Sequence, residues 1–397
     1  MASKVYVAGV GMVPFCKPGA SAHYDEMGAA AVREALADAG VPFTHVQQAF
    51  AGYVYGDSTC GQKALYRVGM SGIPVVNVNN NCSSGSSALW LARQAVRSGA
   101  ADCALAFGFE EMSPGALKPA FPDRPRATER AILLAEELLS DGLEMPSPAI
   151  RQFGGAGLAH MRKYGTSLET FARIRAKASR HAARNPLAVF RKEMTAEDIL
   201  AAPALWEGVL TRPMCCPPTS GAAAAVIVSE AFARRHGLRT DVRMAAQALT
   251  TETPSTYETR DMIRLVGFDM SRSAARQAYE EAGIGPEDVD VIELHDCFAQ
   301  NELLSYEALG LCEEGEGARI VGTGDNSYGG RWVVNPSGGL LSKGHPLGAT
   351  GLAQCYELTQ QLRGAAEARQ VQGARVALQH NIGLGGACVV TVYDKEG

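Results

Sequence analysis

Short apolar segments alternate with longer alanine-rich segments along most of the chain. The apolar segments have the length of buried strands, and the alanine-rich segments are typical of helices. The expected strands are residues 5–9, 74–78, 102–108 and 222–229 in the first half, and 242–248, 289–294, 375–379 and 388–393 in the second. This alternation predicts an α/β protein with a mainly parallel sheet that helices cover on both faces.

The chain also contains an internal repeat. A shift of 243 positions aligns residues 27–46 with residues 270–289, and Ala39-Gly40 then falls on Ala282-Gly283. Both copies have the pattern of a helix that ends at a glycine and is followed by a short loop and a strand. The match predicts a duplicated fold.

A second pair of matching segments carries a cysteine in one copy and a histidine in the other. In both Asn79-Asn80-Asn81-Cys82-Ser83-Ser84-Gly85 and Lys343-Gly344-His345-Pro346-Leu347-Gly348, a glycine follows three residues after the reactive residue. Each segment leads into a predicted helix, whose free N–H groups and dipole favour a thiolate at Cys82. A nearby imidazole at His345 would activate this thiol as a nucleophile.

The pattern changes in the middle of the chain. Residues 112–214 are more polar, carry proline and arginine clusters, and have no counterpart in the second half. We therefore expect a first half made of residues 1–111 and 215–237, an inserted loop domain over the site at 112–214, and a second half at 238–397. Residues 162–192 contain nine Lys or Arg and one acidic residue, Glu169. This segment fits either a solvated helix face or a docking surface for a phosphate-bearing ligand.

Composition excludes several classes of protein. The net charge of −5 over 397 residues argues against a nucleic acid partner. No apolar run approaches the roughly 20 residues of a membrane span, and the first residues lack the pattern of a secretory signal. Ten cysteines without framework spacing indicate a reducing compartment. We expect a soluble cytoplasmic protein in which most cysteines, Cys215 and Cys216 among them, are structural.

Two further segments carry candidate chemistry. His295 and Cys297 lie in the segment 293–298 at the end of a predicted strand, where open α/β sheets place their sites. The glycines of residues 380–387 would free a backbone N–H to point into the same site. His295, Cys297 and His345 are also possible zinc ligands, but no CxxC pair or closed set of four accompanies them.

These segments resemble the thiolase family, and within it the thiolase domain of the sterol carrier protein type. The resemblance covers essentially the whole chain and implies two duplicated βαβαβαββ halves in a five-layered αβαβα sandwich, assembled as a homodimer or a pair of homodimers. The commoner thiolases have Asn-Glu-Ala-Phe where this chain has residues 295–298, and Cys-x-Gly where it has Asn381-Ile382-Gly383. The resemblance therefore implies that the second catalytic cysteine has moved to Cys297.

The resemblance also implies the reaction, an acyl-CoA:acetyl-CoA C-acyltransferase reaction. Cys82 attacks a 3-ketoacyl-CoA, His345 accepts its proton, and Cys297 is the second acid–base. The side chains of His295 and His345 would form one oxyanion hole, and the backbone N–H groups of Cys82 and Gly383 the other. Coenzyme A is a substrate here, and no permanently bound cofactor or metal is expected.

Three other activities fit a chain of this resemblance. A steroid side-chain aldolase component and an acyl-CoA-binding homologue are the first two, but such relatives generally lack the full set of cysteines and histidines. A ketoacyl synthase is the third, and it needs no second acid cysteine. Cys297 is therefore the residue that favours a thiolase.

Overall fold

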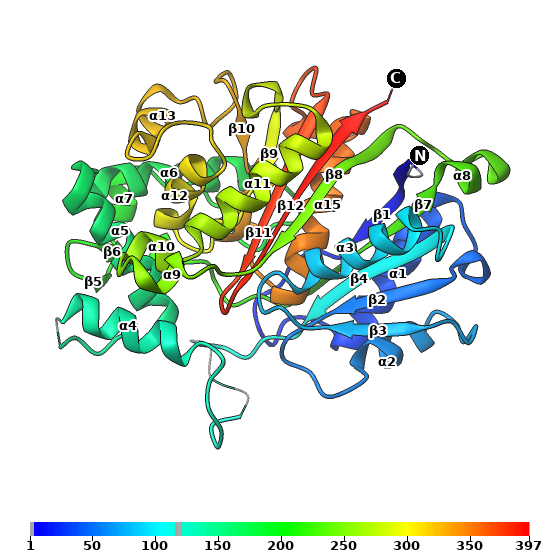
Figure 1. Cartoon of the computed structure of the whole chain (residues 1–397), viewed down its shortest axis with the longest axis horizontal. Coiled ribbons are helices and arrows are strands. Elements are labelled where there is room, and N and C mark those ends of the chain that lie inside the picture. Colours follow the sequence, from blue (N-terminus) through cyan, green and yellow to red (C-terminus); the bar gives the residue numbers. More distant parts are fainter. Residues whose placement is uncertain (1–3, 116–118, 120, 141, 397) are drawn as a thin grey trace.

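The computed structural model describes residues 4–115, 119, 121–140 and 142–396. Ten strands form one hydrogen-bonded ladder in the order β10-β9-β11-β12-β8-β1-β7-β4-β2-β3 (Figure 1). A single register pair, Tyr6 with Arg243, joins the two halves of this ladder. The first half comprises β1 (Val5–Met12), β2 (Gln48–Gly52), β3 (Val75–Val78), β4 (Cys103–Glu110) and β7 (Gly221–Ser229). The second half comprises β8 (Val242–Thr250), β9 (Val291–Glu293), β10 (Val333–Val334), β11 (Val376–Gly383) and β12 (Ala387–Lys395).

The two halves have the same strand order and the same strand directions. In the first, β2 is parallel to β3 and β4, while β7 is antiparallel to β4 and β1. In the second, β9 is parallel to β10 and β11, while β12 is antiparallel to β11 and β8. The predicted duplication is confirmed. The expectation of a mainly parallel sheet is wrong, because β12 follows β11 through a tight turn that reverses the chain, and β7 also enters antiparallel.

Helices lie in three layers around the two half-sheets. The helices α1 (Tyr24–Ala39) and α2 (Cys60–Tyr66) cover the outer face of the first half, and α11 (Phe268–Ala282) and α12 (Ala299–Ala308) lie on the outer side of the second. Between the sheets, α3 (Ser84–Arg97) packs against α15 (Leu347–Arg363). The predicted five-layered sandwich is thus confirmed.

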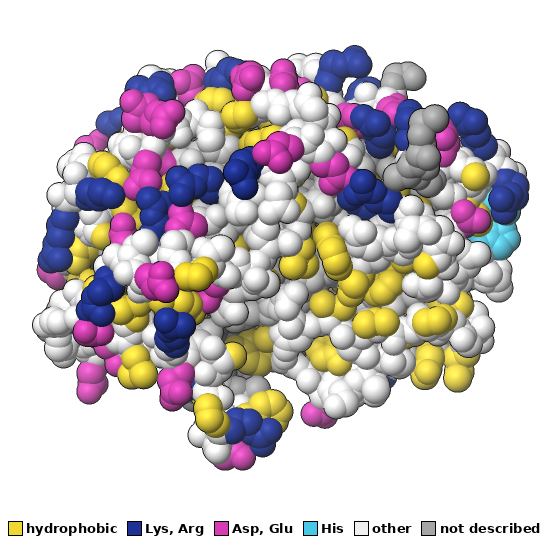
Figure 2. Space-filling view, in the orientation of Figure 1, with side chains coloured by type: hydrophobic (Ala, Val, Ile, Leu, Met, Phe, Trp, Pro, Cys, Tyr) yellow, Lys and Arg dark blue, Asp and Glu magenta, His cyan; other side chains and the backbone are white. Residues whose placement is uncertain are grey.

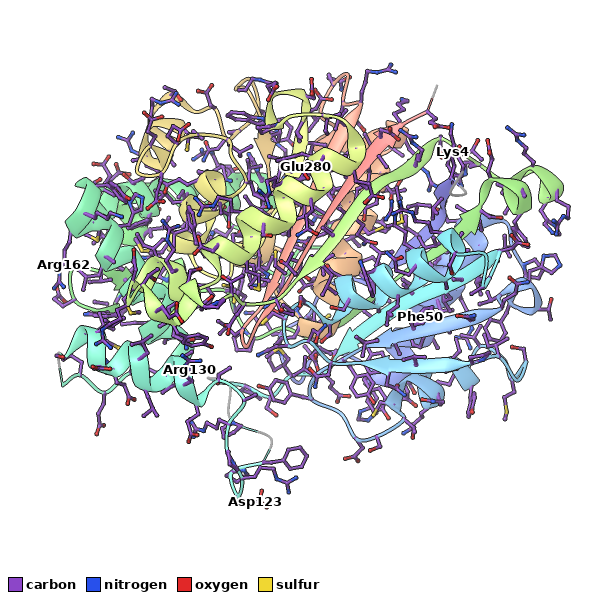
Figure 3. The ribbon with its side chains drawn as sticks, viewed as in Figure 1. Lys4, Phe50, Asp123, Arg130, Arg162 and Glu280 are labelled. Atoms are coloured by element: carbon purple, nitrogen blue, oxygen red, sulfur yellow. The ribbon has the colours of Figure 1, made fainter. Side chains whose placement is uncertain are left out.

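Small side chains let the two central helices pack closely. Ala88 and Ala92 of α3 share one buried cluster with Ala349 and Ala353 of α15. The ring of Phe50 belongs to the same cluster and is buried, whereas Arg162 lies at the left edge of the molecule (Figure 3).

The helices and the hairpin between β4 and β7 form one unit against the second half. It contains α4 (Glu129–Leu139), α5 (Pro148–Tyr164), α6 (Leu168–Ala183), α7 (Ala196–Leu200) and the short hairpin β5 (Ala204–Trp206) and β6 (Leu210–Thr211). Ser147 and Thr195 cap the first turns of α5 and α7 with their side-chain oxygens. Phe153 and Phe171 share a buried cluster with Ile292 of β9, so this unit packs beside the strand end that carries His295.

Short helices complete the described chain: α8 (Glu230–His236), α9 (Ser255–Glu258), α10 (Met262–Leu265), α13 (Gly317–Thr323) and α14 (Gly339–Ser342). Within the described residues, no helix combines the length and the apolar character needed to cross a membrane.

Candidate active site

Cys82 and His345 occupy equivalent places at the starts of the two central helices. Cys82 lies two residues before Ser84, where α3 begins, and His345 lies two residues before Leu347, where α15 begins. Glycines let these helix starts meet, because a Cβ atom on Gly85 would lie 2.5 Å from the carbonyl oxygen of Gly348. The duplicated fold therefore brings the thiol and the imidazole to one point.

Three reactive side chains meet there. The sulfur of Cys82 and one ring nitrogen each of His295 and His345 all lie within 4.8 Å of one another. The two imidazole rings are nearly perpendicular, with their centroids 5.1 Å apart. All three side chains are buried. This arrangement can deprotonate a thiol and offer a hydrogen bond beside it.

The hydrogen bonds of His345 assign its tautomer. Its Nδ1 lies 2.7 Å from Thr350 Oγ1, and the Thr350 hydroxyl donates to the carbonyl oxygen of Pro346 at 2.9 Å. Because a hydroxyl has one hydrogen to donate, Nδ1 of His345 must carry the proton that it shares with Thr350. Nε2 of His345 keeps its lone pair, and within the described chain this buried nitrogen has no hydrogen-bond partner.

Burial keeps both groups of the pair neutral. It lowers the pKa of His345 to about 3, and the charge of Lys343 adds to this effect. Burial also raises the pKa of Cys82 to about 12, and the negative charge of Glu110 contributes to this rise. The expectation that the helix N-terminus holds Cys82 as a thiolate is therefore wrong for the resting protein, because desolvation outweighs the helix start. The thiol must lose its proton to His345 as it attacks.

Cys297 follows His295 by two residues and lies opposite a third thiol, that of Cys216. The backbone N–H of Cys216 donates to the carbonyl oxygen of Cys297 at 2.9 Å, and Cys215 pairs antiparallel with Phe298. Cys216 and Cys297 are therefore directly opposite each other. Burial is the largest cause that raises the pKa of Cys297 well above its usual range, and the charges of Cys216 and Cys82 add to it. Cys216, expected to be structural, therefore lies opposite a predicted catalytic residue, a placement that no local sequence pattern indicates.

The two carboxylates of the segment 293–298 hold the loop that leads to His345. Glu293 accepts hydrogen bonds from the backbone N–H and the hydroxyl of Ser337, and it pairs with Lys343 at 3.3 Å. Asp296 accepts from the backbone N–H of Leu340 at 2.7 Å. The segment therefore alternates between positioning and reactive side chains.

Glu110 is a further residue that the sequence analysis missed. Its carboxylate lies at the end of β4 and accepts hydrogen bonds from the backbone N–H groups of Val54, Tyr55 and Gly348. Burial raises its pKa to about 7. Glu110 thus ties the loop after β2 to the first turn of α15, and its charge acts on the Cys82 thiol.

Gly383 lies against the turn that carries Cys82. A Cβ atom on Gly383 would be 2.0 Å from the carbonyl oxygen of Asn80 and 2.7 Å from the hydroxyl oxygen of Ser83. Only glycine fits there, and the backbone of residue 383 approaches the Cys82 turn. Its role as an oxyanion-hole donor stays a prediction.

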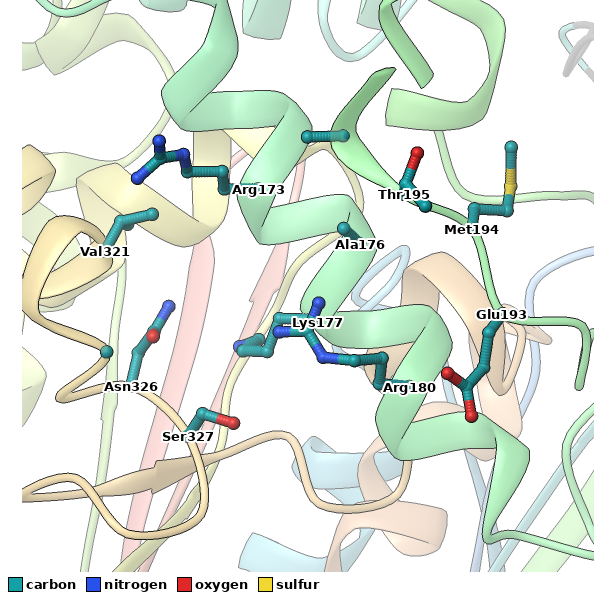
Figure 4. A pocket seen from close by; sticks show the side chains of 12 residues that line it. Arg173, Ala176, Lys177, Arg180, Glu193, Met194, Thr195, Val321, Asn326 and Ser327 are labelled. Carbon is teal, nitrogen blue, oxygen red and sulfur yellow. The ribbon is translucent and has the colours of Figure 1, made fainter. Parts of the chain in front are cut away.

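The basic side chains of residues 162–192 do not share one surface, because some are exposed to solvent and others are buried. Arg175 is buried and donates to Pro213 O and Ser342 Oγ, and Lys177 is buried against Glu302. Lys177 also lines a cavity of about 360 Å³ together with the exposed Arg173 and Arg180 (Figure 4). The lining contains none of the four predicted catalytic residues, and phosphate docking stays a prediction.

Comparisons with known proteins agree with this architecture. Residues 5–231 match the family model described as "Thiolase, N-terminal domain", and residues 251–393 match "Thiolase C-terminal domain-like". Human sterol carrier protein 2 is 54% identical over 394 residues, which cover 98% of this chain and 72% of that protein.

Two solved structures share the fold. An Ltp2-ChsH2(DUF35) aldolase superposes with a TM-score of 0.82 at 22% identity, over 99% of this chain and 98% of that one. Human mitochondrial 3-ketoacyl-CoA thiolase in complex with CoA superposes with a TM-score of 0.75 at 18% identity, over 100% and 98%. At these identities the superpositions establish the fold alone.

Proposed function

The chain belongs to the thiolase family, and we propose that it is an acyl-CoA:acetyl-CoA C-acyltransferase. It cleaves 3-ketoacyl-CoA with coenzyme A, or runs the reverse condensation, through a thioester on Cys82. The observation that carries the proposal is the meeting of the Cys82 sulfur with ring nitrogens of His295 and His345 within 4.8 Å. Coenzyme A is a substrate in this proposal, in keeping with the CoA complex of the structurally similar thiolase.

The first half-reaction forms the acyl-enzyme. The Cys82 sulfur attacks the 3-keto carbon while its proton passes to the lone pair of His345 Nε2. The bond between carbons 2 and 3 then breaks, the acyl group stays on Cys82, and the electron pair leaves as the enolate of acetyl-CoA. The thiol of Cys297 gives its proton to that enolate and becomes a thiolate.

The second half-reaction returns every group to its starting state. The thiol of a second coenzyme A gives its proton to the Cys297 thiolate and attacks the thioester carbon. Cys82 leaves and takes back its proton from His345. During the first half-reaction, the N–H of His295 and the Nε2–H that His345 has gained from Cys82 stabilise the enolate oxygen. In both half-reactions, the backbone N–H groups of Cys82 and Gly383 stabilise the oxygen of the acyl group on Cys82.

The rival activities use only part of this site. An aldolase of the same fold exists, but retro-aldol cleavage needs no thiol nucleophile. A ketoacyl synthase would use a cysteine with two histidines, which Cys82, His295 and His345 provide. Neither activity requires the Cys297 thiol. The presence of this buried thiol two residues after His295 favours the acyltransferase.

Trapping the acyl-enzyme tests the proposal. The protein is incubated with acetoacetyl-CoA, digested, and analysed by mass spectrometry, and we expect an acetyl group on the peptide that contains Cys82. A thiolysis assay across straight, branched and steroid side-chain 3-ketoacyl-CoA substrates then gives the acyl preference. Acetylation of Cys216 or Cys297 instead, or no acetylation at all, would contradict the assignment.

We also propose that the chain forms a homodimer. Strand β3 ends the ladder, and an unpaired strand edge is a ready surface for a second chain. Val76 in this strand is 45% exposed and the nearby Met70 is 79% exposed. Hydrophobic side chains gather over this end of the molecule (Figure 2). Light scattering is expected to report a dimer, and a monomer would contradict the proposal. The cytoplasmic location stays a prediction.

A further inference from the structure

A chain of buried hydrogen bonds leads from helix α15 toward the ring of His295. It begins at the carbonyl oxygen of Gly351, which accepts from the side-chain amide nitrogen of Gln379 at 2.7 Å. A carbonyl oxygen can only accept, so this contact fixes which way the Gln379 amide faces. Its oxygen consequently faces the Tyr393 hydroxyl, which donates to it at 2.6 Å.

The chain continues through helix α3. The second hydrogen of the Gln379 amide nitrogen points to the hydroxyl of Ser86, at 2.9 Å. Ser86 has one hydrogen to donate, and it donates to Oδ1 of Asn381 at 2.8 Å. The amide nitrogen of Asn381 therefore faces Nδ1 of His295, at 2.9 Å. Each of these side chains is buried.

We propose that Gln379, Ser86 and Asn381 form a tautomer lock that holds the single proton of His295 on Nε2. Asn381 donates to Nδ1, so Nδ1 must be an acceptor and cannot carry the proton. The ring is neutral, because burial and the neighbouring His345 keep the pKa of His295 well below its usual range. The three residues are positioning residues, since they act on the reaction through His295.

The lock puts the two site histidines in opposite tautomers. His345 carries its proton on Nδ1, toward Thr350, and keeps a lone pair on Nε2. His295 carries its proton on Nε2 and keeps its lone pair on Nδ1. One ring is therefore a base and the other is a hydrogen-bond donor. The role of this donor rests on the proposed function. In that reaction, the Nε2–H of His295 is ready to donate a hydrogen bond to the developing enolate oxygen from the start.

The proposed tautomer of His295 also affects whether the site can bind a metal ion. The three reactive atoms lie within 4.8 Å, close enough to hold a metal ion. A histidine binds a metal through a nitrogen lone pair, usually while its other nitrogen donates a hydrogen bond. Nδ1 of His295 accepts a hydrogen bond instead, and Nε2 holds a proton. The lock therefore suits an oxyanion better than zinc.

The tautomers can be measured directly on the resting protein. In protein labelled with ¹⁵N-histidine, the nitrogen without a proton resonates far downfield of the protonated one, and His295→Gln and His345→Gln assign the two rings. We expect His295 to be protonated on Nε2 and His345 on Nδ1. A His295 protonated on Nδ1 would overturn the lock. The measurement needs no turnover, so it is independent of the proposed acyltransferase activity.

A serine variant tests what the lock does. Ser86→Ala removes the middle link, and we expect His295 to lose its single tautomer and kcat for thiolysis to fall about tenfold or more, with KM little changed. Ser271→Ala is the matched control, because Ser271 is also buried and bonds a histidine, His380, at 2.9 Å outside the lock. It should leave both the His295 tautomer and kcat unchanged.

The outcomes separate the two proposals. If Ser86→Ala keeps the wild-type tautomer and kcat, the lock is wrong. If the tautomers are as expected but the protein thiolyses no 3-ketoacyl-CoA, the lock stands and the proposed function fails. Tyr393→Phe refines the test, since the Gly351 carbonyl alone should preserve the tautomer.

Discussion

The two halves of the molecule share one topology but differ at a single strand end. After β9 the chain carries His295 and Cys297, whereas the 243-residue shift places Gly52 and Val54 at the end of β2. A Cβ atom on Gly52 would lie 2.7 Å from the carbonyl oxygen of Ser84. In the first half this position is kept small so that the start of α3 can approach. In the second half the same position carries reactive side chains.

The halves also differ in how they treat a buried carboxylate. In the second half Glu293 is paired with Lys343 at 3.3 Å, and both side chains are buried. In the first half Glu110 receives only hydrogen-bond donors, and the described residues place no cation within ion-pair distance of it. The two halves thus share one topology but carry different buried groups.

The largest effect is expected from removing the Cys82 thiol, which the first half contributes to the site. Cys82→Ala should abolish acyl-enzyme formation and lower thiolysis by about 10³-fold or more, because the nucleophile is lost. Mass spectrometry after acetoacetyl-CoA and a steady-state assay check this. Cys312→Ala removes a thiol outside the site and should retain full activity. Acylation that persists in Cys82→Ala would place the nucleophile elsewhere.

Removing the thiol of the second half should have a different effect. Cys297→Ala should still form the acyl-enzyme but turn over about 10²-fold more slowly, because the second acid–base is missing. Quenched-flow mass spectrometry separates acylation from turnover. If Cys297→Ala turns over at the wild-type rate, the halves do not divide the chemistry as proposed, and the ketoacyl synthase alternative gains support.

The sequence alone predicted the frame and the reactive residues, but not what holds them. Alternating apolar segments and the repeat led to the correct layers, and Cys82, His295 and His345 were found at predicted helix starts and a strand end. The contact of Ser86 with Asn381 joins residues 295 positions apart, which no local pattern reveals. The only signal was a run of three polar residues, Gln379, His380 and Asn381, between the apolar ends of the strand β11. The helix start predicted a lowered pKa for Cys82, whereas burial raises it. The burial of a side chain cannot be judged from the spacing of residues in the sequence.

The unpaired carboxylate of the first half should make stability depend on pH. Glu110 has a folded pKa of about 7 against an ordinary 4.5, so between these values the folded protein binds more protons than the unfolded chain. Its contribution to the free energy of unfolding therefore falls as pH rises through this window, by up to about 3 kcal/mol.

Glu110→Gln should remove this dependence. Urea unfolding at about pH 5 and about pH 8 should show a smaller loss of stability in the variant than in the wild type. Glu111→Gln, at the exposed neighbouring residue, should keep the wild-type dependence. Equal pH dependence in wild type and Glu110→Gln would show that Glu110 is ionised like an ordinary carboxylate.

The smallest effect tests the contact that joins the two halves. In Gly85→Ala the new Cβ would lie 2.5 Å from Gly348 O and 3.3 Å from the backbone nitrogen of Gly351. Backbone atoms cannot yield as a flexible side chain does, so α3 and α15 must move apart at a cost of about 1–3 kcal/mol.

Gly322→Ala is the matched control for this contact, because a Cβ there meets nothing within 4 Å. In the helix α13 an alanine should be neutral or stabilise by up to about 1 kcal/mol. Urea unfolding compares the two variants, and the thiolysis rate reports whether Cys82 and His345 have separated. A Gly85→Ala protein as stable and active as Gly322→Ala would mean that the helix starts have room to spare. The packing of the two sheets, rather than the small size of Gly85 and Gly348, would then bring Cys82 close to His345.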